Sequence, residues 1–247
     1  MDDRTILEVL RNQYRRDIER LEFLRAGGCA SYVAIAHDRR YLLKIINSAF
    51  MDSIKQSMDV LHYLAAHDFP APRTLQTRDG RAILAVDDGD GACALVLYEY
   101  IAGHEPSVVD YAEEIGALTG RLHLIMRDYP GRLPVRARPF FIGRYLRILQ
   151  AKGYPHEKRS AYIALGNALW DRVRSLPYGY CHGDLHQGNL LVTPSGALYV
   201  LDFDTSCLAP RMFDVMVMCD TTDYFALTPD AMAAATSVLQ RFVRGYS

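Results

Sequence analysis

The sequence lacks the features that define several large classes of protein. Its five cysteines are widely spaced and form no CxxC pair, which argues against a disulfide framework and a four-thiolate zinc site. Basic and acidic residues nearly balance, at 28 and 29, so no net field would attract nucleic acid or an acidic membrane. No apolar run approaches the about 18 residues of a membrane span, and the charged N-terminus lacks the apolar core of a signal peptide. We therefore expect a cytoplasmic protein with reduced thiols that needs neither nucleic acid nor membrane.

The first part of the chain alternates strand and turn signals. Short runs of β-favouring residues, divided by turn residues, predict three antiparallel strands within residues 18–46. Apolar residues at helical spacing predict helices over 3–15 and 51–67. Two further strands are expected at 81–86 and 93–101. This part is therefore predicted to form a five-stranded antiparallel sheet with one inserted helix.

The pattern becomes mostly helical after Gly103. Helical periodicity covers residues 107–129 and 139–176, resumes near Phe213 and covers 229–243. The only strands predicted in this part are the short runs 190–192 and 198–203, joined by the turn TPSG. A sheet-rich part followed by a helix-rich part indicates an α+β protein of two lobes.

The predicted lobes have definite limits. We expect an N-terminal lobe over residues 1–98, a hinge at 99–103 and a helical C-terminal lobe over 104–247. The total of 247 residues is enough for each lobe to bury a core of its own.

Polar residues gather around the second pair of predicted strands. Asp184 and Asn189 precede the run 190–192, and Asp202 and Asp204 end the strand that follows it. Folding of this hairpin would bring Asn189 and Asp202 to the same end. A few oxygen ligands without a dedicated cage are typical of magnesium held on a nucleotide phosphate. Taken singly, an acid at a strand end is more often just a turn former, and a lysine such as Lys44 in YLLKII usually points to solvent at a sheet edge.

The segment CHGDLHQGNLLV has partial features of two other kinds of site. His182 and His186 are four residues apart, as in a helical zinc pair. Gly183 disfavours a helix there, and a glutamate after the first histidine is absent, so zinc is disfavoured. No GxSxG sequence occurs, which disfavours a serine hydrolase.

The segment HGDLHQGN, followed by LDFD, resembles the catalytic segment of the aminoglycoside phosphotransferase and choline kinase family. Asn189 comes five residues after Asp184, and Asp202 comes thirteen residues after Asn189. Other stretches of the sequence also resemble segments of that family. They are YLLKI, LHYLAAHDFPAP, LVLYEYIAGHEP, IGALTGRLH and APRMFDVMVM. The resemblance implies a bilobal protein-kinase-like fold with the motif in the cleft between a five-stranded N-lobe and a mostly helical C-lobe.

The resemblance also implies a role for each matching residue. Asp184 would orient the acceptor and accept its proton, and Asn189 and Asp202 would hold Mg²⁺. Lys44 would pair with the phosphates of ATP, and His182 would brace the loop. The remaining implied positions are the nucleotide-loop glycines Gly27 and Gly28, the adenine-binding hinge from Glu99 to Ile101, the supporting Asp204 and the structural acid Asp214.

The sequence departs from the family pattern at one functional position. The helix after the lysine strand normally supplies a glutamate that orients the lysine, and that position falls near Ser57. The nearby acids are Asp52 and Asp59. Three alternatives stay open: Asp59 substitutes, Lys44 is held in another way, or the nucleotide site is weakened. There is also no GxGxxG and no segment typical of a regulated protein kinase.

The expected function is ATP- and Mg²⁺-dependent transfer of a phosphoryl group to a hydroxyl of a small molecule, such as an aminoglycoside, amino alcohol, homoserine or sugar. Alternatives are a protein serine or threonine kinase of the same fold and a nucleotide-binding pseudokinase or spore-coat-like structural protein. Asp204, Asp220 and Asp223 are candidates to line a site for a cationic substrate, and for Asp220 and Asp223 the alternative is that they are solvated surface acids. Relatives usually carry further helices after a segment like RFVRGYS, and three alternatives stay open for this chain: it is naturally short, truncated or incompletely observed. The oligomeric state is left open.

Overall fold

A computed structural model describes residues 2–14, 16–27, 29–87, 91–223, 225–226 and 228–246. The chain forms two compact units, Met1–Pro106 with Gly188–Asp204, and Ser107–Gln187 with Thr205–Ser247. The first unit thus takes in a segment from late in the chain, and the lobes expected at 1–98 and 104–247 stay a prediction. None of the helices within the described residues combines the length and the apolar character that crossing a bilayer requires.

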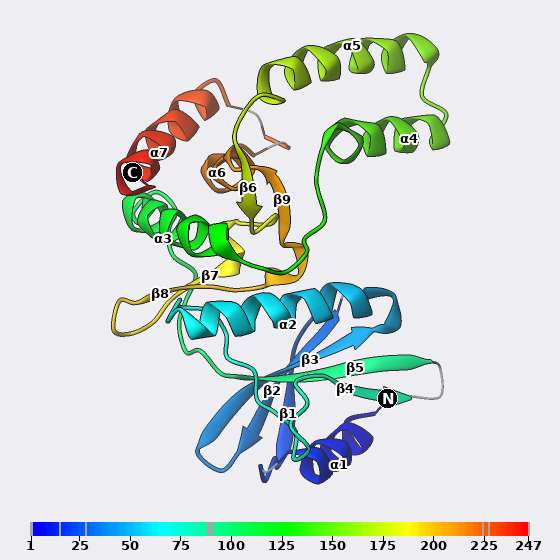
Figure 1. Ribbon diagram of the computed structural model, residues 1–247, viewed down its shortest axis with the longest axis vertical. Helices are drawn as coiled ribbons and strands as arrows, with labels where there is room; N and C mark the ends of the chain where they lie inside the picture. Colours follow the sequence, from blue (N-terminus) through cyan, green and yellow to red (C-terminus); the bar gives the residue numbers. More distant parts are fainter. Residues whose placement is uncertain are drawn as a thin grey trace. The chain divides into compact units, whose positions relative to one another are not determined.

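The first unit is built on an antiparallel sheet with the strand order β1-β2-β3-β5-β4. Its strands and helices are β1 (Arg20–Ala26), β2 (Cys29–Ala36), β3 (Arg39–Asn47), β4 (Leu84–Asp87), β5 (Ala92–Glu99), α1 (Asp3–Gln13) and α2 (Met51–Ala66). Helices α1 and α2 lie on opposite faces of this sheet (Figure 1). The predicted five-stranded antiparallel sheet with an inserted helix is confirmed.

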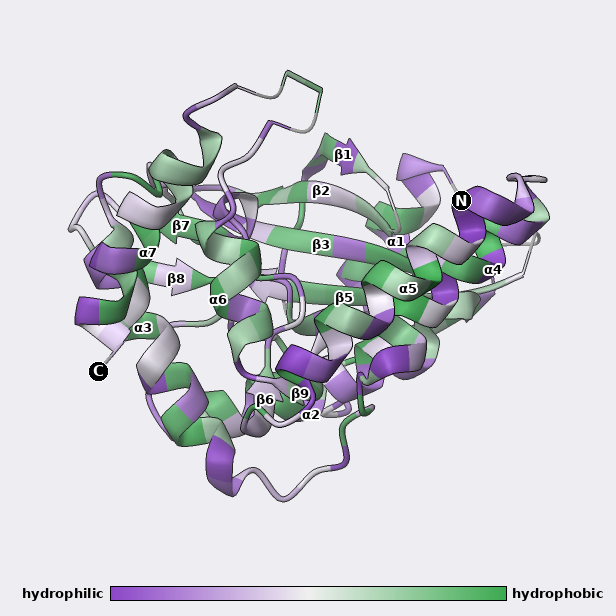
Figure 2. Ribbon diagram, turned by 90° about the horizontal axis from the view of Figure 1, so that it is seen from above, coloured by the Kyte–Doolittle hydropathy of each residue, from purple (hydrophilic) through white to green (hydrophobic). Residues whose placement is uncertain are grey.

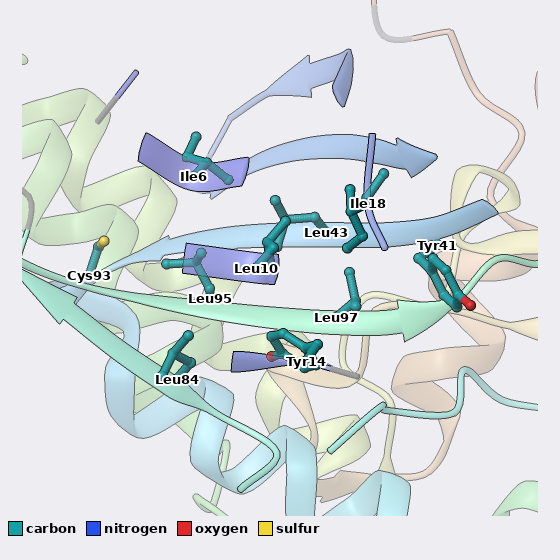
Figure 3. Packing of buried hydrophobic residues seen from close by; sticks show 11 residues of the cluster. Ile6, Leu10, Tyr14, Ile18, Tyr41, Leu43, Leu84, Cys93, Leu95 and Leu97 are labelled. Atoms are coloured by element: carbon teal, nitrogen blue, oxygen red, sulfur yellow. The ribbon is translucent and has the colours of Figure 1, made fainter. Parts of the chain in front are cut away.

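The face of the sheet toward α1 forms a hydrophobic core. Leu10 of α1 packs with Leu43, Leu95 and Leu97, all of which are completely buried (Figure 3). Hydrophobic residues run along β3 and β5 (Figure 2). Because successive side chains in a strand point to opposite faces, this core fixes the neighbours of Leu43 on the other face, toward α2. One of those neighbours is Lys44.

A short hairpin from late in the chain completes the first unit. Strands β7 (Leu190–Val192) and β8 (Leu198–Val200) pair antiparallel. Val192 exchanges two backbone hydrogen bonds with His104, at 3.1 and 2.8 Å, and the Val200 N–H donates to the Pro70 carbonyl at 3.0 Å. These bonds attach the hairpin to the segments that flank the sheet.

The second unit is mostly helical. Its elements are α3 (Ala112–Ile125), a π-helical turn (Pro139–Gly143), α4 (Arg144–Ala151), α5 (His156–Val173), β6 (Tyr178–Cys181), β9 (Cys207–Pro210), α6 (Met212–Cys219) and α7 (Ala231–Tyr246). Helices α3 and α7 lie side by side (Figure 1). The expectation that only two short strands follow Gly103 is wrong, because β6 and β9 pair with each other. The stretch 139–176 is mostly helical as predicted, and a turn at Gly153, whose φ of +69° an α-helix does not allow, separates α4 from α5.

The contact between α3 and α7 depends on glycine. A Cβ placed on Gly116 of α3 would clash with the backbone carbonyl oxygen of Phe242 in α7. We expect Gly116→Ala to lower the free energy of unfolding by about 1–3 kcal/mol, as overpacking does. Gly143→Ala is the matched control: it has helical φ, and its nearest neighbour atom is 3.7 Å from an added Cβ. Urea unfolding that shows equal stability changes for the two variants would contradict this expectation.

Candidate active site

Lys44 is held inside the first unit by two carboxylates. It lies on β3 opposite Ser31 of β2 and is only 7 % exposed. Its Nζ donates to Asp202 Oδ1 at 2.8 Å and lies 3.5 Å from Asp204 Oδ2. A buried ammonium group is costly unless it is paired, so these acids account for its burial. The alternative of a solvated lysine at a sheet edge is therefore wrong.

The two acids also set the charge states of this cluster. Burial alone would lower the pKa of Lys44, but Asp204 and Asp202 outweigh it and raise that pKa above its usual value. Burial raises the pKa of Asp204, Lys44 opposes this rise, and the negative charge of Asp202 adds to it. Lys44 is therefore a stable cation at neutral pH.

A small cavity of about 50 Å³ opens beside Lys44. Its wall includes Asp202 and Asp204, together with Ser57 of α2 and Tyr98 of β5. The cavity thus combines two basic side chains, Lys44 and Arg25, with two carboxylates and apolar surface on the α2 face of the sheet.

Asn189 and Asp202 flank the β7–β8 hairpin at the same end. Asn189 directly precedes β7 and is 4 % exposed, and Asp202 follows β8 by two residues. The Leu201 N–H donates to the Asn189 carbonyl at 2.8 Å, which ties the two flanking segments together. Asp202 has a φ of +62°, a left-handed conformation that is uncommon for residues other than glycine and often marks functional sites. Their role as metal ligands stays a prediction.

The loop that carries Asp184 belongs to the second unit and is held by Asp214. The backbone N–H groups of His182 and Gly183 donate to the Asp214 carboxylate at 2.6 and 2.9 Å. The Thr205 hydroxyl donates to the His182 carbonyl at 2.9 Å. Gly183 has a φ of +86°, and a Cβ there would clash with the Thr205 carbonyl oxygen, so this position requires glycine.

Asp184 itself is more open than its neighbours. Its side chain is 52 % exposed, and its Oδ2 lies 3.6 Å from His186 Nε2. His182 is completely buried, whereas the His186 side chain is about half exposed. The loop is not helical, so the two histidines do not form the helical pair that a zinc site would need.

Behind this loop, Asp214 contacts a histidine for which the sequence predicted no role. His123 of α3 lies with its Nε2 3.0 Å from Asp214 Oδ2, and its Nδ1 lies 2.7 Å from the Tyr246 hydroxyl of α7. His123 lies at the end of the IGALTGRLH segment. The sequence signal that could have identified it is the position of this histidine among apolar residues of a predicted helix.

Cys181 adds a thiol to the same cluster. In the part of the chain that the structure describes, ligand atoms of His123, Cys181 and Asp214 lie within 4.8 Å of one another, as metal ligands do. Burial and the charge of Asp214 raise the pKa of the Cys181 thiol well above its usual value. The Cys181 thiol donates to the carbonyls of Ala209 and Pro210, and Asp214 accepts from the backbone of the loop, so the cluster serves as a hydrogen-bonded support for the loop.

The predicted nucleotide-binding positions are less completely described. The Gly27 N–H donates to the Cys29 carbonyl at 3.1 Å, and Gly28 lies outside the described residues. In the predicted hinge, the Glu99 N–H already donates to the Arg73 carbonyl at 2.9 Å. Adenine contacts there are therefore left to the Glu99 carbonyl and to Ile101, and these roles stay predictions.

One basic residue beside Lys44 was not anticipated. Arg25 of β1 lines the same cavity, with its Nη2 3.9 Å from Asp202 Oδ2. It directly precedes Ala26 and the predicted glycine loop, but a lone arginine in a strand gives no signal of its own.

Comparison with known proteins places these features in a family. The amicoumacin kinase of Bacillus subtilis (strain 168) is 24% identical over 242 residues, which span 92% of this chain and 71% of that protein. The homoserine kinase of Paraburkholderia xenovorans (strain LB400) is 29% identical over 155 residues, spanning 61% of this chain and 46% of that protein. The chain thus aligns with less than half of the homoserine kinase.

Solved structures show the same fold. An amicoumacin kinase in complex with AMP-PNP, Ca²⁺ and Ami superposes with a TM-score of 0.77 at 20% identity, covering 100% of this chain and 77% of that one. Choline kinase from Streptococcus pneumoniae gives a TM-score of 0.67 at 16% identity, covering 97% and 79%. These matches confirm the predicted protein-kinase-like fold class.

A family model settles the enzyme class. The model described as "Phosphotransferase enzyme family" matches residues 24–246, which is most of the chain. This match confirms the predicted family and the prediction that the protein is a phosphotransferase. The chain belongs to the phosphotransferase enzyme family.

Proposed function

We propose that this protein is an ATP- and Mg²⁺-dependent kinase that phosphorylates a hydroxyl group of a small molecule. The observation that carries the proposal is the paired, buried Lys44 beside Asp202, in the unit that also holds Asn189. Family membership supports the transfer of a phosphoryl group, and the cation and oxygen donors of this unit support nucleotide and metal binding.

The residues present suit both ATP and magnesium. Asn189 and Asp202 supply amide and carboxylate oxygens, the donor types that Mg²⁺ takes when it also binds substrate phosphates. Asp204 Oδ1 is a buried oxygen without a hydrogen-bond partner among the described residues, which shows that this cavity has acceptor capacity to spare. Lys44 supplies the positive charge for the phosphates. Bound magnesium would neutralise phosphate charge, which is its usual contribution to such transfers.

Asp184 is the proposed base. It would orient the acceptor hydroxyl and take its proton while the hydroxyl oxygen bonds to the γ-phosphorus and the bond from that phosphorus to ADP breaks. Its exposure leaves it accessible to an acceptor, and the hydrogen bonds from His182 and Gly183 to Asp214 fix the loop that carries it. His182 is a positioning residue here, because its side chain is completely buried.

The acceptor belongs to the range that similar proteins handle by their names: amicoumacin, homoserine, aminopropanol, spectinomycin, choline and gentamicin. These names favour a small molecule over a protein as the acceptor.

Binding of ATP tests the proposal first. A ligand present at about 100 times its Kd stabilises a protein by about 2.7 kcal/mol, so millimolar ATP with Mg²⁺ is expected to raise the melting temperature. Lys44→Met is expected to remove most of this shift, while Lys55→Met on the exposed side of α2 keeps it. The absence of any shift in the unaltered protein would refute the proposal. A panel of the acceptors above, scored by ADP release, then distinguishes a kinase from a pseudokinase that only binds nucleotide.

A further inference from the structure

The position from which a helix glutamate is expected to orient the lysine holds Ser57, and no acid of α2 replaces it. Ser57 is 1 % exposed and lines the cavity beside Lys44. Asp52 and Asp59, the two acids of α2, are exposed to solvent. Of the three alternatives raised by the sequence, substitution by Asp59 is therefore wrong.

Lys44 is instead held by acids from the segment after β8. Asp202 and Asp204 both contact its Nζ, at 2.8 and 3.5 Å. Between them in sequence, Phe203 is 1 % exposed. The buried Phe203 side chain anchors this segment, so the backbone that carries both carboxylates is held in place.

The two acids have different tasks if the proposed function holds. Asp202 is the proposed magnesium ligand, and a carboxylate engaged by a metal is a weaker partner for a lysine. Asp204 is then the acid that remains for Lys44. Its Oδ2 faces Lys44, and it shares the cavity wall with Ser57.

We infer that Asp204 takes the place of the missing helix glutamate and positions Lys44 for the phosphates of ATP, with Ser57 leaving the space that Asp204 requires. Asp204 is a positioning residue in this scheme, because it acts through Lys44. The inference rests on the proposed function, since it assigns a partner to the phosphate-binding lysine.

The test uses binding of Mg·ATP by the full chain, measured as a Kd by calorimetry. Asp204→Asn keeps the shape of the side chain and removes its charge. It is expected to raise the Kd about 10- to 100-fold, as loss of a partner that orients a functional group does. Asp204→Glu keeps the carboxylate and is expected to retain most of the affinity, which also covers the case that Asp204→Asn folds poorly.

A second substitution on α2 gives the sharper result. Ser57→Glu alone adds a third acid beside Lys44 and is expected to weaken binding. In the Asp204→Asn background, Ser57→Glu is expected to restore the Kd, because a carboxylate again reaches Lys44 from the helix. Ser57→Gln is the matched control, having the same size without the charge, and should restore nothing.

Each contrary result has a definite meaning. If Asp204→Asn lowers the melting temperature and leaves the Kd unchanged, Asp204 is only structural and the inference fails. If Asp204→Asn removes only the Mg²⁺-dependent part of ATP binding and Ser57→Glu does not restore it, Asp204 is a metal ligand and the inference fails. If the unaltered protein binds no ATP, the proposed function fails first and the inference with it.

Discussion

Replacement of Asp184 by asparagine is expected to lower the rate of phosphoryl transfer about 100- to 10,000-fold, the usual contribution of a general base. Asparagine has nearly the same size but cannot accept the proton of the acceptor hydroxyl. The side chain of Asp184 is about half exposed, so the substitution exchanges one oxygen for nitrogen at a position open to solvent. The rate is measured as ADP release with the acceptor that the panel identifies.

Two controls isolate the effect of Asp184 on the chemical step. The Kd for Mg·ATP is expected to stay within about threefold of the original, less than 1.4 kcal/mol, because the proposed nucleotide contacts lie on Lys44, Asn189 and Asp202. Asp110→Asn makes the same chemical change at an exposed position of the same unit and should leave the rate unchanged. Transfer that persists at the original rate in Asp184→Asn would remove Asp184 as the base.

Replacement of Asp214 by alanine is expected to lower the free energy of unfolding by about 3–5 kcal/mol, the usual cost of removing one partner from a buried polar pair. The Asp214 carboxylate is completely buried. It accepts hydrogen bonds from the backbone of His182 and Gly183 and lies 3.0 Å from His123 Nε2. Alanine would leave these buried groups without their partner, each at a cost of about 1–3 kcal/mol.

Urea unfolding measures this loss, and Asp128→Ala serves as the control. The Asp128 side chain is 72% exposed, and its ion pair with Arg127 is on the surface. Surface pairs contribute about 0–1 kcal/mol, so the control should change stability little. The free energy of unfolding of a domain is only about 5–15 kcal/mol, so the expected loss is a large part of it. The unfolding of Asp214→Ala is therefore measured well below the melting temperature of the unaltered protein. A loss under about 1 kcal/mol would show that Asp214 does not hold the loop.

Much of the secondary structure could be predicted from local patterns. Helices α1, α2 and α7 follow from apolar residues at helical spacing, and the sheet follows from short strands between turn residues. Strands β6 and β9 were missed for a physical reason. Tyr178–Cys181 pairs with Cys207–Pro210, and neither short run carries an alternating pattern that would mark it as a strand. Pairing between segments so far apart is decided by tertiary contacts.

The sequence identified most residues of the candidate site, but it did not predict which of these residues contact one another. The resemblance of HGDLHQGN and LDFD to a phosphotransferase segment implied phosphoryl transfer, and the family match supports that class of chemistry. The sequence raised the question of what holds Lys44 but could not choose among the alternatives. Asp204 appeared only as a supporting residue, and His123 had no assigned role.

The sequence by itself determined which chemical groups are present and in what order, because the motif HGDLHQGN with LDFD is a matter of local spacing. It also determined that Lys44 and Leu43 face opposite sides of a strand. Only the tertiary structure decided that Lys44 meets Asp202, 158 residues away, and that His123 meets Asp214 across 91 residues. Such contacts depend on how the whole chain buries its apolar surface, which is a property of the fold and not of any one segment.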